Sequence, residues 1–242
     1  GLLRHIPSGT YAVSDQAIAD VLDPPYGEHA SNLGVLLARE LGDMAGIPSF
    51  FVDPVCVDEM TPVAHVTGFK GMERESFFHA LNQKSIARKA AKLLGKTYEE
   101  ARLIVIHMGG GVSVAAHENG LAVDDFNVKD EGAFGMDRAG SLPVNAMINL
   151  CFSGLTKQEV KKLLGSEAGA YSYVGTKDFR EVERRAFEEN DPDCRMVFDA
   201  MAYQLAKDIG AMSTTMDMDV DAIVLTGGMA HSKRLVDALT AR

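Results

Sequence analysis

The chain has 242 residues, of which 46% are hydrophobic and 24% charged, enough for one large or two ordinary globular domains. The net charge of −10 argues against a nucleic-acid partner. The sequence has no apolar run long enough to cross a bilayer and no signal-peptide pattern at its start, so we expect a cytoplasmic protein. The three cysteines are odd in number and lack a CxxC pair, which argues against a disulfide framework or a zinc site.

The first predicted helix follows a segment of loop and short strand over residues 1–20. It begins at Ser31, and its apolar residues recur at helical spacing at Leu33, Leu37, Leu41 and Met44. We expect it to end at Gly46, because the following Pro48 cannot continue a helix.

A short strand is predicted next, over Phe50–Val52. It places Asp53 at a strand end before Pro54, where the carboxylate either faces a cleft or starts a turn by bonding its own backbone. The acidic pair Asp58 and Glu59 is expected to be solvated rather than catalytic.

A second helix is predicted over Phe77–Lys96, with Gly95 as its stop signal. Its expected buried side consists of Leu81, Ile86, Ala90 and Leu93. A basic stripe, interpreted as a solvated face, consists of Lys84, Arg88, Lys92 and Lys96. His79, Asn82 and Gln83 form a denser polar group than a helix cap needs, which suggests an anion site, although a lone histidine at a helix start is more often just a cap.

Residues 103–120 (LIVIHMGGGVSVAAHENG) predict a β-meander. A strand over 103–106 is followed by a glycine corner, a second strand from Val112 and a turn at 118–120. The corner consists of Gly109, Gly110 and Gly111. Its uncovered backbone N–H groups can bind a phosphate, but a Gly-Gly turn is also ordinary hairpin chemistry. His107, just before it, either serves a site or bonds to backbone.

The stretch Glu131–Pro143 (EGAFGMDRAGSLP) is predicted to be an irregular loop around one cation, Arg138. A guanidinium on such a loop suits the stabilisation of a phosphoryl group in its transition state. The alternative is a surface arginine paired with Asp137 or Glu131.

Two capping signals and one long apolar pattern predict the next helices. Thr156 and Glu159 form a capping box for a helix to Leu164, and Asp178 with Glu181 predicts a charged, mostly exposed helix. A long core helix is indicated by Val197, Met201, Leu205, Ile209 and Met212.

The last pattern is an apolar strand over 222–225, the sequence Thr226, Gly227, Gly228 and Met229, and a helix from about Ser232. A strand, a Gly-Gly turn and a helix place backbone amides and a positive helix end at one point, although a tight strand-to-helix connection is the simpler interpretation. Neither glycine run matches a P-loop or GxGxxG. Two such corners in one α/β chain together favour nucleotide binding.

Four motifs, taken in order, resemble the acetate kinase family within the superfamily of actin, sugar kinases and chaperone ATPases. They are FFHALNQKSIARKAA, HMGGGVSVAAH, EGAFGMDRAGSLP and IVLTGGMAHS. The likeness covers the whole chain, and ALNQ and GGG favour the butyrate kinase branch. It implies a two-lobed, actin-like α/β fold (ribonuclease H-like), with residues 1–96 as the remainder of an incomplete first lobe and its connecting helix, and residues 97–242 as the second lobe.

The resemblance also implies roles for individual residues. The glycine corner Gly109–Gly111 would contact the β- and γ-phosphates of ATP, with His107 beside it. His79 would meet the transferring phosphoryl group, Arg138 would neutralise its equatorial oxygens, and Asp53 would lie at the carboxylate and metal side of the cleft. The adenosine would lie against Gly227, Gly228 and Met229.

The implied reaction is reversible transfer of the γ-phosphate of ATP, with Mg²⁺, to a short-chain carboxylate such as butyrate, as in fermentation. Acetate, propionate or a branched acid are alternative substrates, and a non-catalytic ATP-binding module is an alternative of another class. The family implies a homo-oligomer. The expected first phosphate loop and a C-terminal acidic residue are missing, so the metal ligands stay unidentified. We expect the 242 residues alone to bind nucleotide weakly and to transfer little or no phosphate, and a full-length parent to be active.

Overall fold

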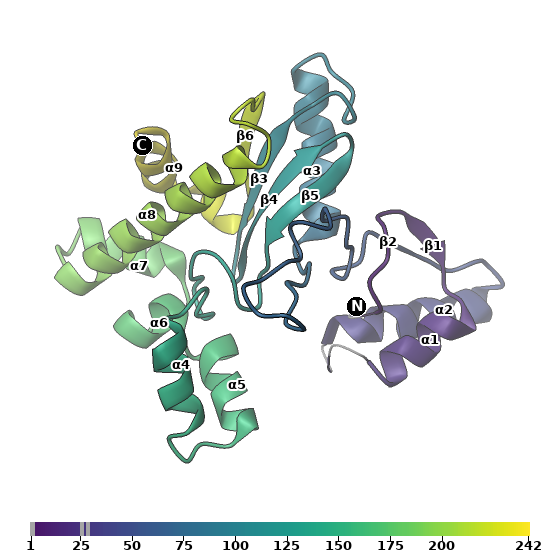
Figure 1. Cartoon of the computed structure of the whole chain (residues 1–242), viewed down its shortest axis with the longest axis horizontal. Coiled ribbons are helices and arrows are strands. Elements are labelled where there is room, and N and C mark those ends of the chain that lie inside the picture. The colour runs from purple at the N-terminus through teal and green to yellow at the C-terminus, as the bar shows by residue number, and fades with distance from the viewer. Residues whose placement is uncertain (1–2, 25–26, 28–29) are drawn as a thin grey trace.

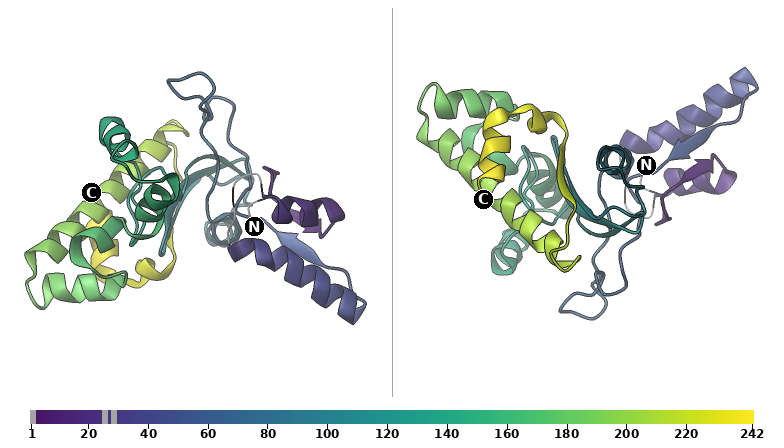
Figure 2. Two further views of the ribbon diagram at one scale, coloured as in Figure 1. Left: turned by 90° about the horizontal axis from the view of Figure 1, so that it is seen from below. Right: turned by 90° about the horizontal axis from the view of Figure 1, so that it is seen from above.

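A computed structural model describes residues 3–24, 27 and 30–242 of the chain. A four-stranded sheet lies at the centre with helices on both faces, and a smaller two-stranded sheet with its own helices lies to one side (Figures 1 and 2). None of the helices in these residues is both long and apolar enough to span a membrane.

The smaller sheet pairs β1 (Thr10–Ala12) with β2 (Phe50–Val52) in antiparallel register. Its helices are α1 (Asp15–Leu22), the 3₁₀ turn η1 (Ala30–Asn32) and α2 (Leu33–Ala45). The predicted strand at Phe50–Val52 is confirmed, and so is the end of α2 at Gly46, whose φ of 66° is left-handed.

The apolar stripe of α2 faces outward. Its residues are 55% to 77% exposed, and they are Leu33, Leu37, Leu41 and Met44. Val35 and Gly42 are buried in their place, Val35 in a cluster with Val13 and Val21 of the α1 region. The spacing therefore predicted the helix but not the side that packs on the rest of the described chain.

The central sheet has the strand order β5-β4-β3-β6. Its strands are β3 (Leu103–Met108), β4 (Val112–Glu118), β5 (Leu121–Phe126) and β6 (Ala222–Thr226). The first three form the predicted antiparallel meander, and β6 lies parallel to β3. Asn119 and Gly120, with φ of 54° and 77°, make the turn between β4 and β5. The predicted buried strand β6 is an edge strand of this sheet, and Ile223 is 52% exposed.

Helices cover both faces of this sheet (Figure 2). Alternate side chains of β3 pack on opposite faces of the sheet: Ile104 and Ile106 in the core with α8 (Pro192–Thr214), and Leu103 and Val105 against α3 (Ala80–Leu93). The helices are α3 (Ala80–Leu93), α4 (Val144–Cys151), α5 (Lys157–Ser166), α6 (Gly169–Val174), α7 (Phe179–Phe187), α8 (Pro192–Thr214), η2 (Gly228–His231) and α9 (Lys233–Thr240). The predicted capping box of α5 and the long core helix α8 are confirmed. Helices α4 and α6 were not predicted, and the prediction of loop and short strand over residues 1–20 was wrong for residues 15–20, which belong to α1.

The face that α3 buries differs from the prediction. Leu81 and Leu93 are 55% and 89% exposed, and the helix instead buries Ala80, Gln83, Lys84, Ala87 and Ala91. Small alanines let the helix approach the sheet closely, whereas leucines at those positions would hold it away. The division of the chain into lobes at residue 96 stays a prediction.

Lys84 and Glu59, both expected to be solvated, form a buried ion pair. The Glu59 carboxylate also accepts hydrogen bonds from the backbone N–H groups of Ser8, at 3.0 Å, and Ala122, at 2.9 Å. Burial alone would raise the pKa of Glu59, but the hydrogen bonds from Lys84, Ser8 and Ala122 outweigh it and lower that pKa. This pair ties the loop before β1 to α3 and to β5.

Two consecutive phenylalanines connect the two cores. Phe77 belongs to the cluster around α1 and α2, whereas Phe78 packs with Val57, Ala115 and Ala122 at the central sheet.

A buried carboxyl group lies on β5. Asp125 is completely buried, and its Oδ2 lies 2.6 Å from Ser76 Oγ, which in turn lies 2.8 Å from the carbonyl oxygen of Val57. Its Oδ1 has no hydrogen-bond partner among the described residues. Burial raises the pKa of Asp125 to about 8. A protonated carboxyl fits this geometry, because it donates to Ser76 Oγ, whose own hydrogen reaches Val57.

We expect Asp125→Asn to become progressively more stabilising, relative to the wild-type chain, as pH rises from about 4 to about 8. In this range the unfolded aspartate ionises while the folded one stays protonated, so wild-type stability falls by up to about 1.4 kcal/mol per pH unit. Asparagine keeps the shape and does not titrate. Urea unfolding at several pH values measures the difference, with the exposed Asp199→Asn as control. A difference that does not vary with pH would contradict the prediction.

Candidate active site

The glycine corner joins β3 to β4 in a register that places His107 opposite Ser113. Of its three glycines, only Gly111 is closely surrounded by side chains of another segment: a Cβ there would lie 2.4 Å from Val128 Cγ2 and 2.8 Å from Arg138 Nη1. A Cβ on Gly110 would meet nothing within 4 Å. None of the three has a positive φ, so space rather than backbone conformation requires a glycine at 111.

Arg138 lies on the predicted loop, which folds onto the glycine corner. The backbone N–H of Met136 donates to the carbonyl of Gly110 at 3.3 Å. The two carboxylates considered as partners of Arg138 are engaged elsewhere, Glu131 with Arg74 and Asp137 with Lys177. Within the described residues, the guanidinium makes one long hydrogen bond, 3.5 Å from Nη1 to the carbonyl of Val128, and no ion pair. It therefore remains available to an anion.

His79 and His107 stack on one another beside this corner. Their ring centroids are 3.7 Å apart and their planes differ by 13°. Asn82 Oδ1 lies 2.8 Å from His107 Nδ1. Burial, with smaller effects of His107 and Arg138, lowers the pKa of His79 to about 3, and burial lowers the pKa of His107. Both rings are therefore neutral near pH 7, and the fold brings both predicted histidines to the neighbourhood of Arg138.

His79 is hydrogen-bonded to a cluster of buried polar side chains on the interior side of its ring. Ser113 Oγ lies 2.7 Å from His79 Nδ1 and 2.8 Å from Gln83 Nε2. Gln83 Oε1 lies 3.1 Å from His117 Nε2, and His117 Nδ1 lies 2.7 Å from the hydroxyl of Tyr98. Of the side chains in this cluster, only Gln83 was predicted from the sequence to belong to a site. A hairpin centred on Gly110 pairs residues 107 and 113, and this symmetry could have identified Ser113.

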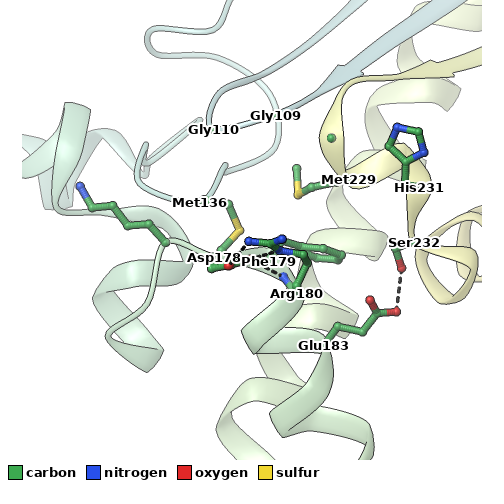
Figure 3. Close-up of a pocket in the computed structure, with 12 residues that line it drawn as sticks. Gly109, Gly110, Met136, Asp178, Phe179, Arg180, Glu183, Met229, His231 and Ser232 are labelled. Carbon is green, nitrogen blue, oxygen red and sulfur yellow. Dashed lines mark hydrogen bonds and ion pairs between the residues drawn. The ribbon is translucent and has the colours of Figure 1, made fainter.

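The second glycine corner lies beside the first, because β3 and β6 are parallel neighbours and their carboxyl ends meet at one edge. Gly227, with a φ of 88°, packs against Met108 so closely that a Cβ would lie 2.4 Å from its carbonyl oxygen. Gly228 and Met229, with Gly109 and Gly110, line a cavity of about 890 Å³ (Figure 3). Gly227 does not line this cavity.

Another part of the cavity wall comes from the start of α7, which the sequence indicated only as an exposed charged helix. Figure 3 shows Phe179 and Arg180 beside Met136, and Glu183 hydrogen-bonded to Ser232 at 2.8 Å. Asp178 caps the helix and holds the Arg180 guanidinium by two hydrogen bonds of 3.0 and 2.7 Å. No motif in the sequence connects this helix with the glycine corners.

Asp53 lies apart from the histidines. It is buried with a φ of 39°, its Oδ1 accepts from the backbone N–H of Gly9 at 2.8 Å, and its Oδ2 lies 3.7 Å from Arg88 Nη1. Arg88 is more than two turns of α3 beyond His79, roughly 13 Å along the helix axis. The predicted role of Asp53 stays a prediction, and the described part of the chain holds no group of three or more His, Cys, Asp or Glu side chains placed to bind a metal.

Comparisons with known proteins agree with this architecture. Residues 68–241 match the model of the acetokinase family. The chain is 50% identical over 235 residues to the protein named "Probable butyrate kinase" of Listeria innocua, a match that covers 96% of this chain and 66% of that relative.

Solved structures show the fold. The acetate kinase of Porphyromonas gingivalis matches with a TM-score of 0.82 at 22% identity, covering 98% of this chain and 63% of that one. A propionate kinase from Francisella tularensis matches with a TM-score of 0.80 at 19% identity, covering 98% and 66%. The predicted actin-like α/β fold is confirmed, and the chain spans about two thirds of the length of these relatives.

We expect Gly111→Ala to destabilise the protein by about 1–3 kcal/mol, because the added methyl group must displace Val128 and the Arg138 guanidinium. Gly110→Ala is the matched control, since its Cβ points into open space and the change should be neutral or stabilising by at most about 1 kcal/mol. Chemical unfolding of both variants measures the difference. Equal effects at the two positions would contradict the crowding described here.

Proposed function

The chain belongs to the acetokinase family, and we propose that the protein transfers the γ-phosphoryl group of ATP to butyrate, forming butyryl phosphate and ADP reversibly. The choice of butyrate rests on the 50% identity to a relative named as a probable butyrate kinase. The observation that carries the proposed reaction is the meeting of Arg138, two neutral histidines and the Gly111 corner at one point. In the opposite direction the reaction makes ATP from an acyl phosphate, as in cytoplasmic fermentation.

The chemistry of the acceptor explains why a cation is needed there. A short-chain carboxylic acid has a pKa of roughly 4 to 5, so it is ionised at neutral pH and needs no general base. The difficulty is that two anions must approach each other, which positive charge and hydrogen-bond donors make favourable. Arg138 fits this demand because no carboxylate of the described residues neutralises it.

The histidines contribute in a different way. Because His79 and His107 are neutral, neither ring adds a second positive charge next to Arg138. The one hydrogen of His107 lies on Nδ1 and is donated to Asn82 Oδ1, so the N–H donor available to a phosphoryl group is that of His79, which the stacking with His107 holds in place before the substrates bind. We assign His79 to the transferring phosphoryl group and His107 to the phosphates next to the glycine corner.

The cavity suits the nucleotide. A volume of about 890 Å³ accommodates a ligand of this size, and the side chains of Met136, Phe179 and Met229 offer apolar surface for a purine. The glycine corners let backbone N–H groups approach the phosphates. Mg²⁺ would be held largely by the phosphates, and its protein ligands stay unidentified, because Asp53 lies apart from the histidines with both carboxylate oxygens engaged.

Two other functions are distinguishable from this one. Acetate, propionate or a branched acid would use the same residues with a different acid pocket. A non-catalytic module that binds ATP to move two lobes would not require Arg138 and His79 to face a carboxylate substrate.

We expect the full-length protein to form hydroxamate when incubated with ATP, Mg²⁺, hydroxylamine and butyrate, because hydroxylamine traps the acyl phosphate. A series from acetate to valerate, including branched acids, measures the preference, and butyrate should give the highest kcat/KM. A higher value with another acid would support the related kinase. If none of the acids gives hydroxamate, the result would support the non-catalytic binding module.

We expect Arg138→Ala to lower kcat by about 100-fold or more while changing the Kd of ATP only a few-fold, because the guanidinium acts on charge that is shared in the transition state. Arg195→Ala, which removes an exposed arginine from α8, is the control and should retain full activity. Hydroxamate formation measures kcat, and titration with ATP measures the Kd. Equal losses in turnover and affinity would refute the role given to Arg138.

A further inference from the structure

His79 is the outer end of a chain of hydrogen bonds that leads into the interior. The direction of each bond can be derived from one fixed point. Gln83 Nε2 lies 3.2 Å from the backbone carbonyl oxygen of Ser113, and a carbonyl oxygen can only accept. The side-chain atom facing it must therefore be the amide nitrogen, which fixes the orientation of the Gln83 amide.

This orientation determines the inner bonds. With its nitrogen toward Ser113, Gln83 presents its Oε1 to His117, so His117 Nε2 carries the hydrogen and donates at 3.1 Å. His117 Nδ1 is then an acceptor, and the Tyr98 hydroxyl donates to it at 2.7 Å. Burial lowers the pKa of His117 to about 3 and raises that of Tyr98, which is consistent with a neutral ring and a protonated hydroxyl.

The same orientation determines the outer bond. Ser113 Oγ accepts from Gln83 Nε2 at 2.8 Å and lies 3.4 Å from the backbone N–H of His79, so both of its lone pairs face donors. Its one hydrogen then has His79 Nδ1, at 2.7 Å, as its acceptor. If Nδ1 carried a hydrogen, three donors would face one oxygen, and the serine hydrogen would have no acceptor.

The remaining ring nitrogen of His79 faces outward. No described residue forms a hydrogen bond with Nε2, and Asp125 Oδ1 is the only side-chain nitrogen or oxygen of the described residues that is buried without a partner. His79 Nε2 is therefore not fully buried and is free of protein partners among the described residues.

We propose that this buried chain locks His79 in the neutral tautomer that carries its hydrogen on Nε2, so that the ring presents an N–H donor to the phosphoryl group. The positioning residues of the chain are Ser113, Gln83, His117 and Tyr98. The use of this donor in phosphoryl transfer rests on the proposed function, whereas the tautomer itself does not.

The lock has a clear physical benefit. The other neutral tautomer would aim a lone pair at the phosphate oxygens, and this would repel them. Ser113, Gln83 and His117 are at most 1% exposed, so water cannot easily reverse the bonds. The energy needed to orient the donor is thus supplied by folding rather than by substrate binding.

The test is ¹⁵N NMR of the protein labelled at histidine, because protonated and unprotonated ring nitrogens have distinct signals. His79→Gln identifies the His79 signals by their loss. We expect the substrate-free wild-type protein to carry the His79 hydrogen on Nε2 near pH 7. A hydrogen on Nδ1, or a mixture of both tautomers, would overturn the proposal.

The variant Ser113→Ala tests the cause. Without its hydroxyl, the His79 signals should move toward a mixture of tautomers, and kcat of the kinase reaction should fall about tenfold with little change in KM for ATP. Ser76→Ala removes the same group from another fully buried serine and should leave both quantities unchanged. Unchanged His79 signals in Ser113→Ala would refute the lock.

A second variant covers the case in which Ser113→Ala does not fold. Tyr98→Phe removes the innermost donor; because Gln83 still fixes the hydrogen on His117 Nε2, we expect His117 to keep this tautomer while its Nδ1 signal shifts with the loss of the hydrogen bond from Tyr98. A His117 ring with its hydrogen on Nδ1 in the wild-type protein would reverse every bond and refute the proposal. If His79 carries its hydrogen on Nε2 but no acid gives hydroxamate, the proposed function fails while the lock stands.

Discussion

The register of the β3–β4 hairpin is the constraint on which the candidate site depends. Because the pairing is centred on Gly110, His107 lies directly across from Ser113, and Ser113 in turn lies below His79. A shift by one residue would turn every side chain of one strand to the other face of the sheet. The stacked rings, the buried hydrogen bonds and the position of Gly111 next to Arg138 all follow from this single pairing.

Helix α3 lies close to the sheet and provides the side chains that hydrogen-bond to the histidines of the hairpin. The helix carries Asn82 and Gln83 to the two histidines of the hairpin, and it can do so because alanines occupy the positions between helix and sheet. Lys84 continues the same buried face, and its charge is compensated by Glu59. Such a pair adds little net stability, but removing one partner leaves a buried charge, so it strongly favours this one arrangement.

Local signals were sufficient for much of the fold. The meander, the capping box of α5 and the end of α2 at Gly46 are each determined by a few neighbouring residues. The buried face of α3 was predicted wrongly, because an apolar period gives leucine the core position and cannot detect that the sheet leaves room only for small side chains.

The site shows the same limit. The motif resemblance selected His79 and Arg138, which the fold brings to one neighbourhood, and the glycine corners, which share a cavity. The contribution of α7 to that cavity depends on how distant helices pack, and nothing within the segment around Phe179 encodes it locally.

Phe77 and Phe78 impose a restriction of another kind. Adjacent side chains enter two different cores, so the segment before α3 works as a fixed spacer. Gaining or losing one residue here would turn α3 by about 100° about its axis and would direct Lys84 away from Glu59. We infer that the length of this segment, from Phe77 to Lys84, cannot change without loss of one of the two anchors or of the ion pair.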